Sequence, residues 1–284
     1  MEMDFQNLVK LRPILTLSAM ALLLLWETAM PFYGYFRYRS SERLKHGARN
    51  VALGLLNAVL IAVSFTALWA ITASFSAERR LGVLYWIPLP AWLHFGMAIL
   101  LFDFWMYTWH RLNHRIGFLW RFHRVHHSDT CMDVTSATRF HFGEIFFSSI
   151  LRIPIIFAIG MTFTELVVYE MMMILVVQFH HANIALPAFV DRVLRWVIVT
   201  PGMHKLHHSH EFEEQNSNFT AFLSIWDRLM GTYLIRDDLE GVTLGVDDLS
   251  DANALTFRGI MTTPMKPMPS TPLEQRFGKK SGRP

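Results

Sequence analysis

The chain has 284 residues, of which 52% are hydrophobic and only 17% charged, and its mean hydropathy is +0.27. This composition is too apolar for an ordinary soluble domain and indicates a membrane protein. The formal charge is +3, and the basic residues mostly flank apolar runs, which argues against a nucleic-acid partner. The single Cys131 excludes an internal disulfide and a cysteine-rich metal site, so any metal would need histidine or carboxylate ligands.

Three apolar runs, 14–35, 51–73 and 87–109, each reach the roughly 20 residues that a helix needs to cross a bilayer. The first run lacks a small-residue cleavage site, so we interpret it as a membrane span and not as a signal peptide. A further stretch, 145–179, is too long for one crossing and predicts a helical hairpin that turns near Gly160. We therefore expect an all-α polytopic membrane protein with about four to five membrane helices.

Basic residues in two segments predict the orientation of these spans. The loop between the first two spans is strongly basic, with Glu42 as its one acid, and a second basic segment follows the third span. Lys and Arg concentrate on the cytoplasmic side of membrane proteins, so both segments should be cytoplasmic. The residues concerned are Arg37, Arg39, Arg43, Lys45, Arg49, Arg111, Arg115, Arg121 and Arg124.

Two further segments differ from the spans. Residues 184–199 mix apolar and charged positions in a pattern that fits a helix lying in the membrane interface. Residues 261–284 are rich in Pro, Lys, Ser and Thr without apolar periodicity, which predicts a disordered basic tail. The remaining residues, 1–260, are expected to form a single membrane-embedded domain.

Histidine clustering is the main functional signal, because twelve of the 14 histidines fall within 110–210. His110 and His114 are one helical turn apart, and the pattern H-x-x-H-H occurs at 123–127 and again at 204–208. Spacings of three and four residues bring side chains to one face of a helix. Two triads and a pair exceed what one metal ion can use, so the pattern predicts a binuclear site of neutral imidazoles in a cytoplasmic cap.

Other functions remain open at this point. Isolated histidines are ordinary polar residues at membrane interfaces, and we assign His46, His94 and His210 to that class. A histidine-rich membrane metal transporter is an alternative, although its ligands should lie deep within several spans and not in Arg-rich surface segments. A catalytically inactive lipid-binding protein is another alternative, and the complete histidine motifs argue against it.

The three histidine motifs resemble the histidine boxes of the fatty acid hydroxylase and sterol desaturase superfamily. The resemblance covers about 102–233 and is greatest to alkylglycerol monooxygenase-like members and their bacterial relatives. The boxes are HRLNH (110–114), FHRVHH (122–127) and MHKLHH (203–208), and the further similar segments are TSATRFHFGE (135–144), HHAN (180–183), VTPGMHKLHHSH (199–210) and LSIWDRLMGTY (223–233).

This resemblance implies a membrane-bound non-haem diiron oxygenase that hydroxylates or desaturates a lipid. Its cofactors would be two iron ions (Fe2+/Fe3+), with dioxygen as co-substrate. The chain has no Rossmann glycine pattern, haem-attachment cysteines or iron–sulfur ligands, so a separate reductase, ferredoxin or b-type cytochrome should supply electrons. A bacterial inner-membrane location follows, with the histidine boxes on the cytoplasmic side.

The resemblance also implies the metal ligands. They would be His110, His114, His123, His126, His127, His181, His204, His207 and His208. His180 stands where the family usually has another residue, so the neighbouring pair is ambiguous, with His181 preferred. Supporting roles around the metal centre are expected for Asp103, His141, Glu144, Asn183, Asn218 and Asp227.

Overall fold

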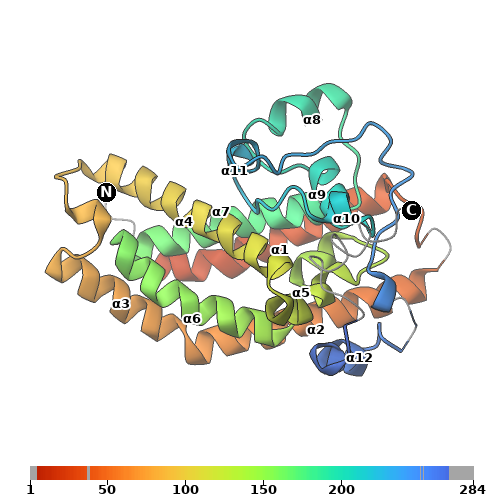
Figure 1. Ribbon diagram of the computed structural model, residues 1–284, viewed down its shortest axis with the longest axis horizontal. Coiled ribbons are helices and arrows are strands. Elements are labelled where there is room, and N and C mark those ends of the chain that lie inside the picture. The colour runs from red at the N-terminus through yellow and green to blue at the C-terminus, as the bar shows by residue number, and fades with distance from the viewer. Residues whose placement is uncertain (1–4, 37–38, 250, 252, 269–284) are drawn as a thin grey trace, which may run out of the picture.

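The computed structural model describes residues 5–36, 39–249, 251 and 253–268. Its long helices run side by side in an elongated bundle (Figure 1). They are α1 (Phe5–Ala29), α2 (Ser40–Ser64), α3 (Thr66–Arg79), α4 (Ala91–Arg115), α6 (Phe142–Ile159) and α7 (Phe163–His181). Over the described ranges the chain forms no strand, only two isolated bridges, and this confirms the predicted all-α polytopic class.

Short helices gather at one end and along one side of the bundle, where they form a cap (Figure 1). The α-helices among them are α5 (Gly117–His127), α8 (Ala188–Leu194), α9 (Pro201–His207), α10 (Phe212–Gln215), α11 (Ile225–Leu229) and α12 (Phe257–Thr262). The 3-10 turns of the cap are η2 (Val134–Thr138), η3 (Asp247–Leu249) and η4 (Thr263–Met265), whereas η1 (Val83–Tyr85) lies in the loop between α3 and α4. The cap therefore contains all three histidine boxes, the first of them at the end of α4.

Four helices are long and apolar enough to cross a membrane. These candidate spans are Lys10–Ala29, Ser40–Ser64, Phe142–Ile159 and Phe163–His181. The boundaries differ from those predicted, since α1 ends at Ala29 and the helix spanning run 51–73 breaks at Phe65 between α2 and α3. Helix α4 is not among the four, because polar residues, including His94 and Asp103, interrupt its apolar sequence.

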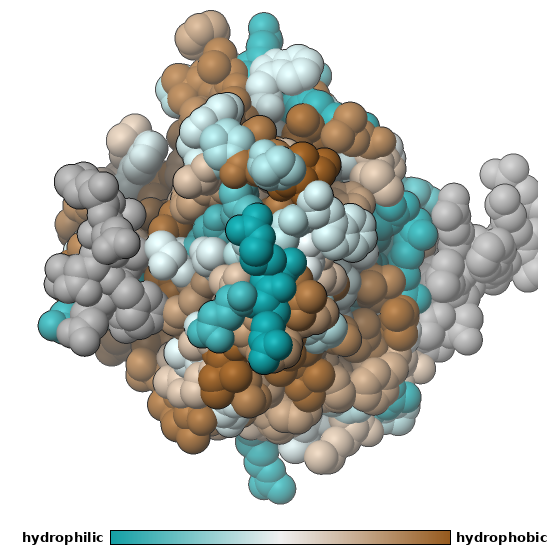
Figure 2. Space-filling view, turned by 90° about the vertical axis from the view of Figure 1, so that its left-hand side faces the viewer, coloured by the Kyte–Doolittle hydropathy of each residue, from teal (hydrophilic) through white to brown (hydrophobic). Residues whose placement is uncertain are grey.

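The end of the bundle away from the cap is suited to a membrane. Figure 2 shows this end covered mostly by hydrophobic residues around a hydrophilic centre. The loop between α3 and α4 lies at this end and exposes Trp86 and Ile87, and the first turn of α4 exposes Trp92. Exposed tryptophans are typical of membrane–water interfaces. Together with the four candidate spans, this surface identifies an integral membrane protein.

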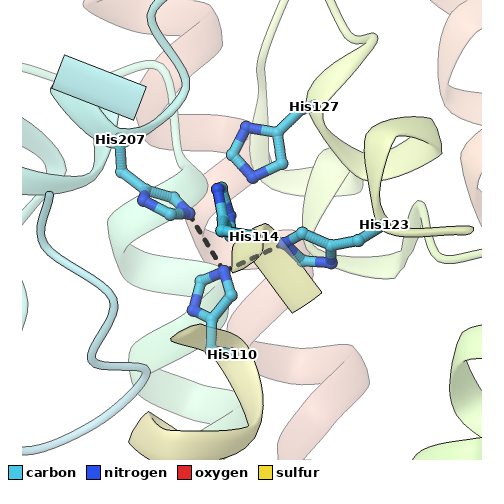
Figure 3. Close-up of side chains that lie close together, drawn as sticks. All are labelled: His110, His114, His123, His127 and His207. Atoms are coloured by element: carbon cyan, nitrogen blue, oxygen red, sulfur yellow. Dashed lines mark hydrogen bonds between the residues drawn. The ribbon is translucent and has the colours of Figure 1, made fainter. Parts of the chain in front are cut away.

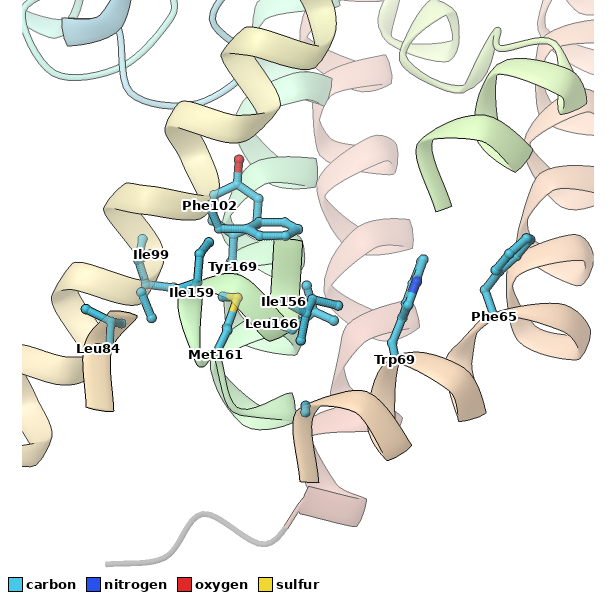
Figure 4. Close-up of a cluster of buried hydrophobic side chains, with 12 residues drawn as sticks. Phe65, Trp69, Leu84, Ile99, Phe102, Ile156, Ile159, Met161, Leu166 and Tyr169 are labelled. Carbon is cyan, nitrogen blue, oxygen red and sulfur yellow. The ribbon is translucent and has the colours of Figure 1, made fainter. Parts of the chain in front are cut away.

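A buried apolar cluster joins α3, α4, α6 and α7 (Figure 4). Phe102 and Tyr169 meet edge to face at a ring-centroid distance of 5.1 Å, and Ile156 is fully buried. Trp69 also donates a hydrogen bond of 3.0 Å from Nε1 to the Ser149 carbonyl oxygen. Because lipid tails are themselves apolar, close packing and such interhelical hydrogen bonds hold helices together within a membrane.

The hairpin predicted near Gly160 is confirmed. Gly160 ends α6 in the left-handed conformation, with φ of 81°, and Thr162 begins α7 with a capping box to Glu165. A Cβ on Gly160 would lie 2.8 Å from the Tyr85 ring and 3.0 Å from the Leu81 carbonyl oxygen. Glycine is needed here because its backbone adopts this conformation freely and leaves room for the adjacent loop.

The C-terminal segment packs against the second histidine box. Arg124 donates hydrogen bonds of 2.7 Å and 3.0 Å to the carbonyl oxygens of Thr263 and Lys266 and pairs with Asp248. Of the predicted tail 261–284, the first residues thus belong to α12 and η4, and those from 269 onward lie outside the described residues. Helix α8 presents exposed apolar side chains, and its place in the membrane interface stays a prediction.

Replacing Gly160 by Ala should destabilise the protein, because a left-handed L-residue costs about 1–2 kcal/mol and the new Cβ would press on Tyr85 and Leu81. Gly96 is a matched control in α4, where a Cβ meets nothing within 4 Å. Gly96→Ala should be neutral or stabilise by up to about 1 kcal/mol. Thermal unfolding in detergent measures both, and equal melting temperatures for the two variants would contradict the assigned role of Gly160.

Candidate metal centre

The nine histidines predicted as ligands form two groups in the structure. The first comprises His110, His114, His123, His127 and His207, and the second comprises His126, His181, His204 and His208. Within each group, one ring nitrogen of every residue lies within 4.8 Å of the others. In the first group the rings turn their nitrogens toward a common centre (Figure 3).

Helical spacing explains how each box is divided. In α5, His123 and His127 are one turn apart and join the first group, whereas His126 faces the second. The third box is divided in the opposite sense, since His204 and His208 join the second group and His207 the first. The first and last histidines of each H-x-x-H-H box are four residues apart and align along the helix. The middle histidine, three residues after the first, points to one side of that line. Each H-x-x-H-H triad therefore serves both groups.

The two groups adjoin. The rings of His127 and His208 stack at a centroid distance of 4.4 Å with an interplanar angle of 16°, and the His126 and His127 rings lie 5.5 Å apart. Helix α7 completes the second group with His181 at its C-terminal end. Four helices, α4, α5, α7 and α9, thus bring both groups to one place in the cap.

Oxygen acceptors fix the protonation of three imidazoles in the first group. His110, His123 and His207 each donate a hydrogen bond from Nδ1. The acceptors are the Phe219 carbonyl oxygen at 2.6 Å, a Glu144 carboxylate oxygen at 2.8 Å and the Ser217 carbonyl oxygen at 2.7 Å, respectively. With the proton on Nδ1, the Nε2 atom of each ring carries a lone pair.

These lone pairs converge. The Nε2 atom of His110 lies 3.0 Å from the Nε2 atoms of both His123 and His207. Since no proton remains to join them, three lone pairs at this distance repel one another unless a cation lies between them. This arrangement is the one that metal-ligating histidines adopt, with the second ring nitrogen bonded to a carbonyl or carboxylate.

The second group shows the same pattern. His181 donates from Nδ1 to the Val177 carbonyl oxygen at 2.7 Å, and its Nε2 atom lies 3.1 Å and 3.0 Å from those of His126 and His204.

Two further histidines of the first group, His114 and His127, have both ring nitrogens buried without a hydrogen-bond partner. Buried polar atoms are normally paired, so these nitrogens are suited to bind a cation.

Burial favours the neutral form of imidazoles in both groups. Desolvation lowers the pKa of His207 to about 3. It also lowers the pKa values of His127, His204 and His208 well below the ordinary range, and neighbouring histidines lower them further. Neutral imidazole is the form that binds metal ions. The donor set consists wholly of imidazole nitrogens and fits iron or another divalent transition metal.

Among the residues expected to support the site, Glu144 is in direct contact with a histidine of the two groups, since its carboxylate accepts a hydrogen bond from His123. Asp227 and Asp103 act through the segment that carries Phe219. Asp227 accepts hydrogen bonds from the backbone N–H groups of Phe219 and Thr220 at 2.7 Å and 3.1 Å. Asp103 accepts from Trp226 Nε1 at 2.8 Å and from the Leu223 N–H at 3.2 Å.

The other expected residues lie outside the two groups. Asn218 has a left-handed φ of 51° and bonds the backbone of Leu234, and Asn183 bonds the backbone of Tyr33. His141 caps the N-terminus of α6. His180 is buried with its ring centroid 3.9 Å from that of His204, but it contributes to neither group.

The role of His46 was not predicted from the sequence, where this residue was assigned to an ordinary interface position. It is buried, and its Nε2 lies 2.9 Å from both carboxylate oxygens of Asp129. Asp129 follows the second box by two residues and also accepts a hydrogen bond of 2.6 Å from Ser136. The pair therefore ties α2 to the turn after α5, and its partners are too distant in sequence for spacing to reveal it.

The chain is similar to one known family and to several named enzymes. A family profile described as "Fatty acid hydroxylase" matches residues 95–232. An ornithine lipid hydroxylase of Rhizobium tropici is 29% identical over 78% of this chain and 66% of its own length. An alkylglycerol monooxygenase of Xenopus tropicalis is 31% identical over 52% of this chain and 31% of its own. A human cholesterol 25-hydroxylase is 25% identical over 53% of this chain and 59% of its own.

The chain thus spans between about a third and two thirds of the length of these relatives. No solved structure matches it. The matched region 95–232 contains all nine grouped histidines, together with Glu144 and the carbonyl groups that orient them. The prediction from the three boxes is confirmed: the histidine-box region of the chain, residues 95–232, matches the fatty acid hydroxylase family.

Proposed function

We propose that this protein is a membrane-bound non-haem diiron oxygenase that hydroxylates or desaturates a lipid. The observation that carries the proposal is the convergence of imidazole lone pairs in two adjoining groups, with Nδ1 protons held by oxygen acceptors. Two ions held side by side suit a reaction that needs more than one electron from its metal centre. The names of the relatives, hydroxylases and monooxygenases, favour a redox-active metal.

The nine histidines would hold the ions, five from the first group and four from the second. Iron bound there would supply the dioxygen and electron-transfer chemistry that side chains alone cannot perform. The protein's own contribution is orientation. Glu144 and the Phe219 and Ser217 carbonyl groups hold three imidazoles in place through Nδ1, and burial of the rings excludes water from the centre.

The substrate is proposed to be a lipid, because the relatives are named for ornithine lipid, alkylglycerol and cholesterol, which share an amphiphilic character. The four candidate spans place the protein where such molecules are found. The basic segments around α2 and α5 support a cytoplasmic cap in a bacterial inner membrane. Electrons would come from a separate reductase, ferredoxin or b-type cytochrome, consistent with a chain that carries no such cofactor motif.

Isotopically labelled dioxygen tests the reaction. Protein loaded with iron and supplied with an electron donor should convert a membrane lipid into a product that is heavier by one labelled oxygen atom or lighter by two hydrogen atoms, as detected by mass spectrometry. His126→Gln should abolish the product, whereas His141→Gln, outside both groups, should retain it. Full conversion by the His126 variant would refute the assigned centre.

Glu144→Gln should weaken metal binding or activity by roughly 10–100-fold, because the carboxylate that orients His123 is lost. Glu165 offers a matched control, since it bonds His94 at 2.8 Å in a histidine–carboxylate pair away from both groups. Metal titration and product formation should therefore be little changed in Glu165→Gln. Equal losses in the two variants would mean that Glu144 has only a general structural effect.

The metal-free protein should lose stability as the pH falls below about 6.5. The folded-state pKa of His207 is lowered to about 3, so the unfolded chain binds protons more readily than the folded one in this range. Each such histidine costs about 1.4 kcal/mol per pH unit below its unfolded pKa. Melting temperatures of metal-free protein between about pH 8 and pH 5.5 measure this, and a flat profile would contradict it.

A further inference from the structure

A cavity of about 210 Å³ lies in the cap beside the second histidine box. It is formed by the loop that follows α1, the first turns of α2 and the turn after α5. Its lining includes three arginines and three apolar or aromatic residues: Arg39, Arg49, Arg139, Tyr35, Phe36 and Leu255. This volume is below the roughly 300–1,000 Å³ of pockets for whole small molecules, so it suits a headgroup or a small anion.

Positive charge in this cavity is not balanced by its carboxylates. Two acids line it, but Glu42 is paired with Lys45 at 3.0 Å and Asp129 with His46 at 2.9 Å. Of the three arginines, Arg139 is buried, and its guanidinium donates hydrogen bonds to Val125, Asn50 and Ser128. The other two, Arg39 and Arg49, supply the uncompensated charge.

Arg39 and Arg49 are placed to receive a ligand. Arg39 is exposed, and its guanidinium has no hydrogen-bond partner within the described part of the chain. Arg49 is half-buried and donates from Nε and Nη1 to the Lys45 and Leu255 carbonyl oxygens, which leaves Nη2 for a ligand. Guanidinium groups match the geometry of phosphate and carboxylate oxygens, which makes arginine the usual residue for binding such anions.

The remaining walls indicate where the anion comes from. Tyr35, Phe36 and Leu255 give the cavity an apolar side, as expected for a ligand that carries a hydrocarbon part. The loop that supplies Tyr35 and Phe36 joins two candidate membrane spans, Lys10–Ala29 and Ser40–Ser64. Basic pockets beside membrane helices commonly bind the headgroups of anionic lipids.

We propose that this cavity is a binding site for a phosphate or carboxylate group, held by Arg39 and Arg49 and carried by the headgroup of a membrane lipid. The site is separate from the histidine groups and does not depend on the proposed oxidation. Two of its lining residues, Asp129 and Arg139, also hold the turn after α5. A bound headgroup would therefore contact the segment that follows His126 and His127.

The test compares ligand binding by full-length protein in mild detergent. Phosphatidylglycerol, phosphatidylcholine and inorganic phosphate are titrated separately, and binding is followed by thermal shift and native mass spectrometry. The test variant is Arg39→Gln/Arg49→Gln. The matched control is Arg258→Gln/Lys266→Gln, which removes two positive charges from the C-terminal segment, away from the cavity lining.

Phosphatidylglycerol should bind the wild-type protein and the control, and the test variant should bind it at least about tenfold more weakly. Saturation by inorganic phosphate alone, with the same loss in the test variant, would support the anion site with a soluble anion as its source. Equal binding of phosphatidylglycerol and phosphatidylcholine, no binding of any probe, or an equal loss in the control would overturn the proposal.

Should the double variant prove unstable, Arg39→Gln alone replaces it, because that side chain is exposed and its loss leaves the folded contacts intact. Metal content serves as the second readout. Unchanged metal content with weakened lipid binding separates this site from the histidine groups, so failure of either proposal can be recognised without the other.

Discussion

The structure depends on one constraint: imidazoles whose protons are held on Nδ1 direct their Nε2 lone pairs at one another. His110 illustrates it, with Nδ1 donating to the Phe219 carbonyl oxygen and Nε2 lying 3.0 Å from the Nε2 atoms of His123 and His207. Such an arrangement is unfavourable without a cation and favourable with one. The fold must therefore hold α4, α5 and α9 in a fixed relation so that the lone pairs cannot move apart.

Buried packing and polar contacts outside the boxes provide that rigidity. The apolar cluster of α3, α4, α6 and α7 fixes the helices that lead into the cap. Asp103 then bonds Trp226 and so holds the segment that carries Phe219, while His46 bonds Asp129 at the end of the second box. Asp103 in α4 and His46 in α2 thus support the histidine groups indirectly, through the segments that they hold. Such a role is consistent with the free-energy cost of placing polar side chains in membrane helices.

Helical spacing predicted which histidines act together, but not how they are shared. Spacing within the three boxes indicated eight residues, and the family resemblance added His181. Neither could show that His126 joins His204 while His123 joins His207. That division depends on how α5 and α9 face each other. The carbonyl acceptors and the His46–Asp129 pair were equally hidden, because they join segments far apart in sequence. The break at Phe65 was missed since apolar composition continues through it.

Metal content and X-ray absorption of the purified protein test whether the centre is binuclear. After loading with iron, the protein should hold two ions per chain, with imidazole nitrogens as their main nearest neighbours and a metal–metal signal that reports two adjoining sites. His110→Gln and His204→Gln should each perturb mainly the ion of its own group. One ion per chain, or ions that stay bound unchanged in both variants, would contradict the binuclear centre.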